Sequence, residues 1–105
     1  PPFTDLYRLT VSGPEESRVV RACRVLCQSL EPWLAAQRQA GREGEVLGPA
    51  PAPVVRVNDR YRYRILVKCR ASKEVRALLA QLLRTAQLDR ANRQLSFWLD
   101  VDPMD

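Results

Sequence analysis

Apolar and polar residues alternate in three stretches of the chain, the pattern of a strand with one buried face. The first stretch runs from Phe3 to Val11, and the last runs from Leu95 to Val101, followed by Asp102-Pro103. The most regular stretch runs from Arg60 to Arg70, where apolar and tyrosine residues alternate with five cations and one leucine without a break in period. This stretch is therefore predicted to have one apolar face and one cationic face.

Two other segments carry apolar residues at three- and four-residue spacing, which predicts amphipathic helices. The first is expected to begin with Pro14 at its first helical position and to finish at Gly41 and Gly44. Pro32 lies inside it and is expected to kink the helix or to end its first part. The second helix is predicted to start at Ser72 as its N-cap, with an apolar stripe that follows.

The segment between these helices is rich in proline. Three prolines at alternate positions from Gly48 to Pro53 predict an extended, polyproline-like strap that does not join a sheet, and Glu45 to Leu47 is expected to be a short strand at most. Asn58-Asp59 is a turn signal before the cationic strand.

The order strand, helix, strand, strand, helix, strand predicts a ferredoxin-like split βαβ sandwich, an α+β fold that residues 1–105 form as a single domain. Both helices should cover one face of a four-stranded antiparallel sheet, with the first strand in a central position. The other face would then be bare. Alternation places seven candidate site residues on it: Arg8, Arg60, Arg62, Arg64, Lys68, Arg70 and Trp98.

The composition favours an anionic partner for this face. The 105 residues include 17 Lys and Arg against 12 Asp and Glu, a formal charge of +5, and 15 of the cations are Arg. Arginine suits bidentate contact with phosphate and stacking on rings. Cations beside an exposed aromatic ring are typical of single-strand nucleic-acid binding surfaces. The alternative is a docking surface, in which Trp98 anchors an interface and some arginines pair across domains.

Other chemistry has little support. The chain has no His, which removes the commonest general base and metal ligand. Its three cysteines, Cys23, Cys27 and Cys69, are predicted to be reduced and buried, as in a cytoplasmic protein. Asp100 and Asp102 share a strand face but lack the partners of a metal or acid–base site. No catalytic residue is expected in this segment, and a start at Pro1 indicates a fragment of a longer protein.

Four segments carry a family resemblance that spans nearly the whole chain. They are residues 1–6 (PPFTDL), 46–53 (VLGPAPAP), 60–68 (RYRYRILVK) and 100–103 (DVDP). Together, in this order and spacing, they resemble the C-terminal domain of the PriA replication-restart DNA helicases, also called primosomal protein N′.

The resemblance implies that the parent is a bacterial, cytoplasmic, ATP-dependent DNA helicase that unwinds 3′ to 5′ and restarts replication at stalled forks. It implies ATP, magnesium and zinc in upstream domains of the parent and no cofactor in this segment, which has neither a Gly-x-x-x-x-Gly-Lys loop nor a Cys-x-x-Cys pair. Implied partners are single-stranded or forked DNA, single-strand-binding protein, other primosome proteins and the remaining domains of the parent, with no membrane.

The resemblance also bears on the site. The residues from Arg60 to Tyr63 match the basic-aromatic strand of the family, so Arg60, Arg62, Arg64 and Lys68 are expected to contact phosphates. Trp98 comes from strand alternation instead. The terminal Asp-Val-Asp-Pro, whose charge would repel DNA, is expected to be structural.

Overall fold

The computed structural model describes residues 4–103, so Phe3, at the start of the first predicted strand, lies outside the described residues. Four strands and two long helices follow one another in the predicted order. They are β1 (Thr4–Gly13), α1 (Glu16–Gln39), β2 (Gly44–Val57), β3 (Arg60–Arg70), α2 (Lys73–Leu88), a short 3₁₀ helix (Arg90–Asn92) and β4 (Ser96–Pro103).

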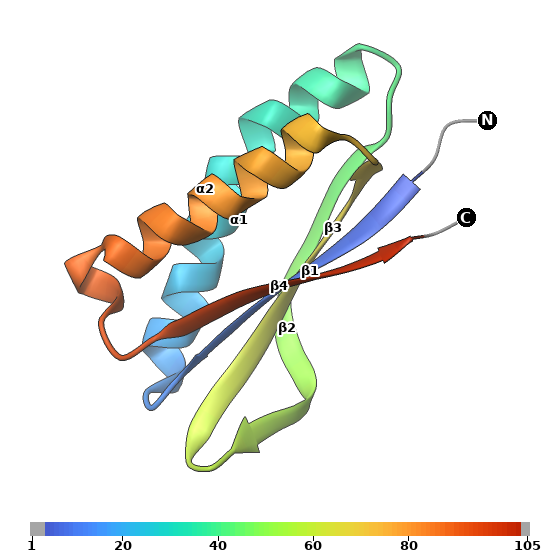
Figure 1. Cartoon of the computed structure of the whole chain (residues 1–105). Helices are drawn as coiled ribbons and strands as arrows, with labels where there is room; N and C mark the ends of the chain where they lie inside the picture. Colours follow the sequence, from blue (N-terminus) through green and yellow to red (C-terminus); the bar gives the residue numbers. More distant parts are fainter. Residues whose placement is uncertain (1–3, 104–105) are drawn as a thin grey trace.

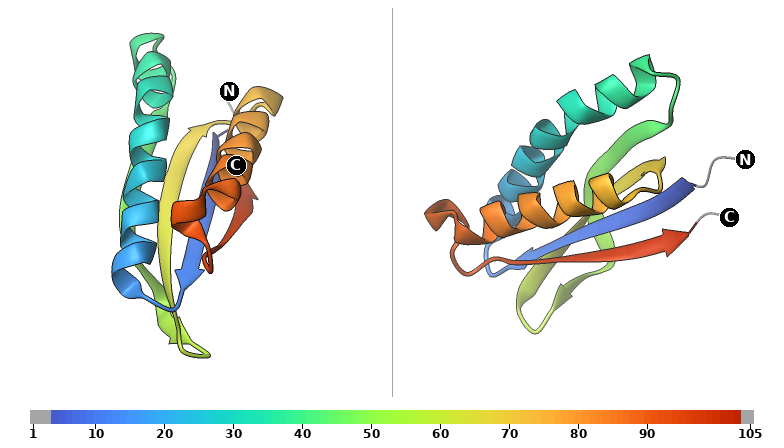
Figure 2. Two further views of the ribbon diagram at one scale, coloured as in Figure 1. Left: turned by 90° about the vertical axis from the view of Figure 1, so that its left-hand side faces the viewer. Right: turned by 45° about the horizontal axis from the view of Figure 1, so that its top comes forward.

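The strands form one antiparallel sheet in the order β2-β3-β1-β4. Both helices lie on the same face of this sheet, as Figure 1 and the turned views of Figure 2 show. This arrangement confirms the ferredoxin-like α+β sandwich and the central position of the first strand. It leaves the opposite face of the sheet without a helix, and that face is called the open face below.

The core lies between the sheet and the helices. Each strand contributes alternate residues, and each helix contributes residues three or four apart, as the periods of strand and helix require. The completely buried apolar side chains include Tyr7, Leu9 and Val11 of β1, Ile65 and Val67 of β3, Leu30 and Leu34 of α1, and Val75 and Leu79 of α2. Cys23 and Cys69 are buried in the same core and Cys27 lies at its margin, all as free thiols. Burial raises the pKa of Cys23 to about 12.

A cluster of polar groups lies at the margin of this core. The Tyr7 hydroxyl donates a 2.8 Å hydrogen bond to Oδ2 of Asp5, and Arg76 of α2 approaches the same oxygen at 3.3 Å. Burial, together with the bond to Asp5, raises the pKa of Tyr7 to about 12. The cluster satisfies a carboxylate that is only 4% exposed.

Helix α1 is continuous from Glu16 to Gln39, so the prediction that Pro32 could end it is wrong. Pro32 lacks an amide hydrogen for the carbonyl of Gln28, which costs about 3 kcal/mol in a helix interior. Leu30 and Leu34, on either side of it, are completely buried. Burial of two such side chains contributes roughly 1.5–3 kcal/mol each, enough to offset the lost bond. The helix ends before Gly41, which has a φ of +76°.

Two helix starts can be compared with their predictions. Ser72 caps α2 as predicted, since its Oγ accepts a 3.1 Å hydrogen bond from the amide of Val75. Helix α1 starts later than predicted, at Glu16, because β1 continues through Ser12 and Gly13. Pro14 therefore precedes the helix instead of occupying its first turn.

The proline-rich segment differs most from the prediction. It is part of β2, a strand of 14 residues that pairs with β3, and so it does join the sheet. Strand β2 is at the edge of the sheet, where proline, which has no amide hydrogen for the ladder, is tolerated. The register shifts between Leu47 and Ala50 and again between Pro51 and Arg56. Gly48 lies in the first irregularity with a φ of +106°.

The connection from β2 to β3 is a two-residue turn at Asn58-Asp59, as predicted. Both residues have positive φ values, 52° and 60°. This is the geometry that joins two twisted antiparallel strands most directly, and Asn and Asp tolerate it better than other residues with a side chain. The turn fixes the register that sends the cationic residues of β3 to the open face.

Candidate nucleic-acid interface

The open face is built from three neighbouring strands whose registers align the candidate residues in rows. Arg62 of β3 pairs with Ser12 of β1, and Arg64 pairs with Thr10. Thr10 in turn pairs with Trp98 of β4. Arg64 and Trp98 therefore flank one central residue. Neighbouring strands lie about 4.8 Å apart, so this row spans roughly 10 Å.

Arg62 and Trp98 meet across the central strand. The guanidinium carbon of Arg62 lies 5.8 Å from the centroid of the Trp98 ring, within the range of a cation–π contact. The shorter side chains between them, Thr10 and Ser12, are 2% and 5% exposed although no helix covers this face. Trp98 itself remains 36% exposed. The structure thus confirms that Trp98 shares a surface with the arginines of β3.

Arg64 is an open-face cation whose charge is not compensated by the side chains that the structure describes. Its Nε is buried and has no hydrogen-bond partner, and the side chain forms no ion pair within residues 4–103. A buried donor without an acceptor costs about 1–3 kcal/mol, and more when it is charged. A phosphate beside the guanidinium group would compensate the charge of Arg64.

Arg60 is committed to the protein's own backbone. Its Nη2 donates to the carbonyl oxygens of Ser12 at 3.1 Å and Gln94 at 2.7 Å. Its guanidinium also approaches the hydroxyls of Ser12 at 3.4 Å and Ser96 at 3.3 Å. Arg60 therefore joins β3 to β1 and to the start of β4. These bonds give Arg60 a structural role. The phosphate contact expected of Arg60 from the sequence stays a prediction.

Two other candidates are ion-paired. Arg8 of β1 pairs with Asp102 of β4, and this contact supports the structural role predicted for the terminal acidic segment. Lys68 lies 3.2 Å from Glu43, a residue of the turn before β2. Both pairs are partly exposed, so each contributes little to stability. They also lower the positive charge that Arg8 and Lys68 can offer to a ligand.

Arg70 ends β3 and faces the same side as Arg62 and Arg64 by strand alternation. It is exposed, and its side chain makes no hydrogen bond or ion pair with the described part of the chain. The structure thus brings together Arg62, Arg64 and Trp98, places Arg70 at the sheet end, and engages the remaining candidates elsewhere.

Sequence reasoning missed an apolar part of the open face. Leu66 of β3 pairs with Leu47 of β2, and Leu47 is 49% exposed. These leucines, with Arg64 and the proline segment of β2, line a shallow cavity of about 290 Å³. Leu66 was visible as the one apolar residue among the cations of β3. Its partner was not, because Glu45 to Leu47 was expected to be a short strand at most and its register with β3 could not be predicted.

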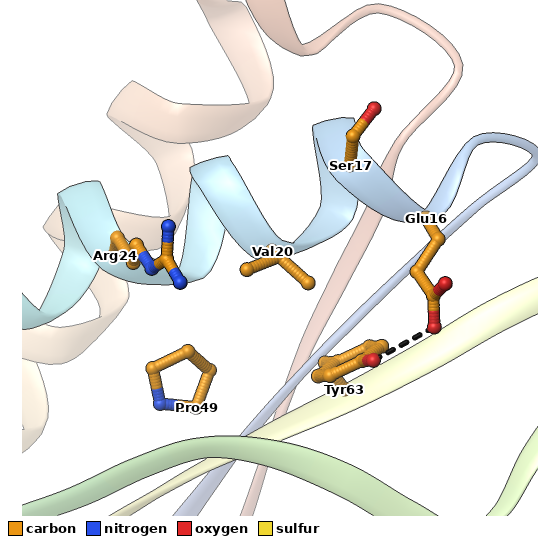
Figure 3. Close-up of a pocket in the computed structure, with 6 residues that line it drawn as sticks. All are labelled: Glu16, Ser17, Val20, Arg24, Pro49 and Tyr63. Atoms are coloured by element: carbon orange, nitrogen blue, oxygen red, sulfur yellow. Dashed lines mark hydrogen bonds between the residues drawn. The ribbon is translucent and has the colours of Figure 1, made fainter.

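Another cavity lies on the other side of the sheet. It has a volume of about 590 Å³ and is lined by Val20 and Arg24 of α1, Pro49 of β2 and Tyr63 of β3, with Glu16 and Ser17 at one end (Figure 3). The Tyr63 hydroxyl donates a 2.7 Å bond to Glu16, which raises the pKa of Tyr63. The lining contains one carboxylate, Glu16, and one guanidinium, Arg24, so the cavity favours neither anions nor cations. The hydroxyl of Tyr63 is already hydrogen-bonded to Glu16 of α1.

Comparison with known proteins identifies the family. Residues 1–104 match the family model described as the primosomal protein N C-terminal domain. The chain belongs to this family. It is 27% identical over 103 residues to "Replication restart protein PriA" of Bacillus subtilis, covering 98% of this chain and 12% of that protein. It is 34% identical over 107 residues to the protein of the same name from Synechocystis, covering 99% of this chain and 11% of that protein.

The primosomal protein N C-terminal domain thus accounts for about a ninth of the length of these curated relatives. The family assignment confirms the resemblance found in the sequence. Within residues 4–103, the described helices include none with the length and apolar character needed to cross a membrane.

Proposed function

We propose that this chain is an accessory DNA-binding domain of a replication-restart protein, and that single-stranded DNA binds to its open face. The observation that carries the proposal is the grouping of Arg62, Arg64 and Trp98. Two guanidinium groups of β3, which form no ion pair with the side chains that the structure describes, face a partly exposed ring across β1 on a bare sheet. Phosphate neutralisation beside base stacking is the combination that single-strand binding surfaces use.

In the proposed complex, one face of the Trp98 ring stays against Arg62 and a base stacks on the other. The phosphates on either side of this base would pair with Arg62 and Arg64. Residues on one face of a strand repeat about every 6.6 Å, so Arg62 and Arg64 are spaced as separate contacts along a backbone. The proposal includes branched DNA in so far as a fork presents single strands.

The longer protein is proposed to be a bacterial, cytoplasmic 3′ to 5′ DNA helicase that hydrolyses ATP with magnesium and carries zinc in other domains. The family membership and the name "Replication restart protein PriA" of both relatives support this proposal. The described residues do not supply a cluster of three metal-ligating side chains. The role assigned to this chain is therefore to hold DNA near the helicase.

Fluorescence anisotropy of the 105-residue chain with labelled single-stranded and forked DNA tests the proposal. Affinity should fall as salt rises, because each phosphate that pairs with a cation releases counterions. Double-stranded DNA of the same length is the comparison. Binding that is absent at low salt, or that ignores salt, would remove the proposal.

A docking role is the second candidate, favoured by the exposed Leu47 and Trp98 on the open face. Its partners would be single-strand-binding protein, other primosome proteins or the remaining domains of the parent. The Leu47→Glu variant separates the two roles, because Leu47 lies away from the Arg62–Trp98 contact. Docking predicts that this variant loses protein binding, measured by titration calorimetry, while DNA binding is retained or only weakened by the added charge.

A further inference from the structure

The end of α1 and the start of α2 lie at the same end of the sheet (Figure 1). A second group of cations lies there. A cavity of about 390 Å³ opens there between the two helices and the last residue of β3. Its lining includes Trp33 of α1, Arg42, Arg70 of β3, and Ser72, Lys73 and Glu74 at the start of α2.

The cations of this cavity are not neutralised within the described part of the chain. The side chains of Arg70 and Lys73 form no hydrogen bond or ion pair with the side chains and backbone that the structure describes. The Nε of Arg42 donates to the neutral side-chain oxygen of Gln37 at 2.8 Å. The one carboxylate in the lining is Glu74, so three positive charges face one negative charge. Mutual repulsion of these cations makes an anionic occupant favourable.

An aromatic ring lines the same cavity. Trp33 is half-buried, and part of its surface packs against the core while part faces the cations. A planar ring beside several cations can hold a base by stacking while the cations hold the attached phosphate. Isolated inorganic anions would leave this ring unused.

The cavity is continuous with the open face through Arg70. This residue belongs both to the cationic row of β3 and to the cavity lining. From Arg62 to Arg70 the strand covers about 26 Å. A DNA strand that follows β3 past Arg64 therefore arrives at the cavity as it leaves the sheet.

We infer that this cavity is a second nucleotide-binding site, with a phosphate between Arg42, Arg70 and Lys73 and the attached base against Trp33. The inference rests on the proposed function, since the nucleotide belongs to the same DNA strand. The phosphate has two possible sources, an internal phosphodiester or the phosphorylated end of a strand. Both present the same chemistry, and a terminal phosphate carries a larger charge.

The fluorescence of Trp33 can report directly on binding in this cavity. The chain has two tryptophans, so in the Trp98→Phe variant all tryptophan emission comes from Trp33. Thymidine monophosphate and a twelve-residue thymidine oligonucleotide, with and without a 5′-phosphate, are titrated into this variant. Quenching by each probe is expected, and stronger quenching by the 5′-phosphorylated oligonucleotide would assign the site to a strand end. Equal quenching by the two oligonucleotides would assign it to internal phosphates. Unchanged emission at oligonucleotide concentrations that saturate anisotropy would overturn the inference.

Charge variants test the cations. Arg42→Gln/Lys73→Gln is compared with Arg21→Gln/Arg84→Gln, which removes the same charge from exposed helix positions outside the cavity. The first variant should lower the slope of log affinity against log salt by about 0.7 if its two cations share one phosphate. The control should leave that slope near the wild-type value. An equal loss in both variants would overturn the inference, provided circular dichroism melts show that both are folded.

Failure of this site and failure of the open face give different results. If Arg62→Gln/Arg64→Gln abolishes oligonucleotide binding but Trp33 emission never responds, the open face stands and the second site falls. If thymidine monophosphate quenches Trp33 while no oligonucleotide binds, the cavity binds nucleotide but the proposed function falls. Glu74→Gln should strengthen quenching, because it removes the one carboxylate of the cavity.

Discussion

The guanidinium group of Arg62 reaches across the central strand to lie 5.8 Å from the centre of the Trp98 ring. The two residues come from β3 and β4, and the small side chains of β1 between them let the long ones meet. The contact holds the ring on the sheet surface at a fixed place beside Arg64. This preorganisation lowers the entropy lost when a base stacks on the ring.

Replacing Trp98 with Ala should weaken binding of a thymidine oligonucleotide by the value of one stacked base, about 1–3 kcal/mol. Trp98→Phe keeps an aromatic face and should lose much less. Anisotropy titrations at a single low salt concentration measure both. Equal losses in the two variants would mean that stacking does not contribute at this position.

Removing Arg62 and Arg64, which form no ion pair with the side chains that the structure describes, should change the salt dependence of DNA binding. Each single-strand phosphate contact contributes about 0.7 to the slope of log affinity against log salt, so Arg62→Ala/Arg64→Ala should reduce the slope by about 1.4. The matched control is Arg21→Ala/Arg84→Ala, with the same loss of charge on exposed helix positions. If the control lowers the slope as much, binding follows net charge and not the open face.

Arg60 should behave differently from its neighbours on β3. Its bonds to the carbonyl oxygens of Ser12 and Gln94 hold the sheet end together, so Arg60→Ala should lower the free energy of unfolding by about 1–3 kcal/mol. Urea denaturation measures this. The salt slope for DNA should stay near that of the wild type. A stable variant with a reduced slope would instead return Arg60 to the phosphate contacts predicted from the sequence.

The buried hydroxyl of Tyr7 should make the fold sensitive to alkali. Its pKa rises from 10.0 to about 12 in the folded chain, so the stabilisation is complete below pH 10 and is lost as the pH rises from 10 to 12. Burial also raises the pKa of Cys69 from 9.0 to about 11, which acts in the same direction. Tyr7→Phe should therefore lose less stability than the wild type between pH 10 and 12. The midpoints of urea denaturation of both proteins, measured across this pH range, test the prediction. If the midpoints of the two proteins fall in parallel with pH, Tyr7 is not the group responsible.

Helix α1 should gain stability when Pro32 is replaced with Ala. The variant restores the amide that can bond to the carbonyl of Gln28, and the gain should be up to about 3 kcal/mol. Gln28→Ala, on the same helix and exposed, is the control and should change stability by less than about 0.5 kcal/mol. A less stable Pro32→Ala variant would show that the helix path around residue 32 depends on the proline ring.

Strands β1 and β3 and helix α2 could be predicted closely because their burial follows a regular period. Val75, Leu79 and Leu83 are buried as the stripe requires, and β3 has the predicted bounds. The path of β2 could not be predicted, because the restriction that proline imposes depends on which edge of the strand is paired. That pairing is set by β3, where the partner of Pro51 is Tyr63, twelve residues further along the chain.

The open face could also be predicted only in part. Alternation was enough to place Arg62, Arg64 and Trp98 together, since strand order and period determine it. The partners of Arg60 and Lys68 could not be predicted, because Gln94 and Glu43 lie in turns whose paths have no period. The strands thus decide which face the cations occupy. The connecting segments decide which of these cations remain available to a ligand.

The prolines of β2 also have a consequence for self-association. Proline donates no amide hydrogen, so an edge strand that contains several prolines is a poor template for a neighbouring chain. The opposite edge, β4, carries the exposed Asp100, whose negative charge disfavours pairing with another copy of the same edge. A concentrated solution of this domain is therefore expected to resist fibril growth, although half of its sheet lies uncovered.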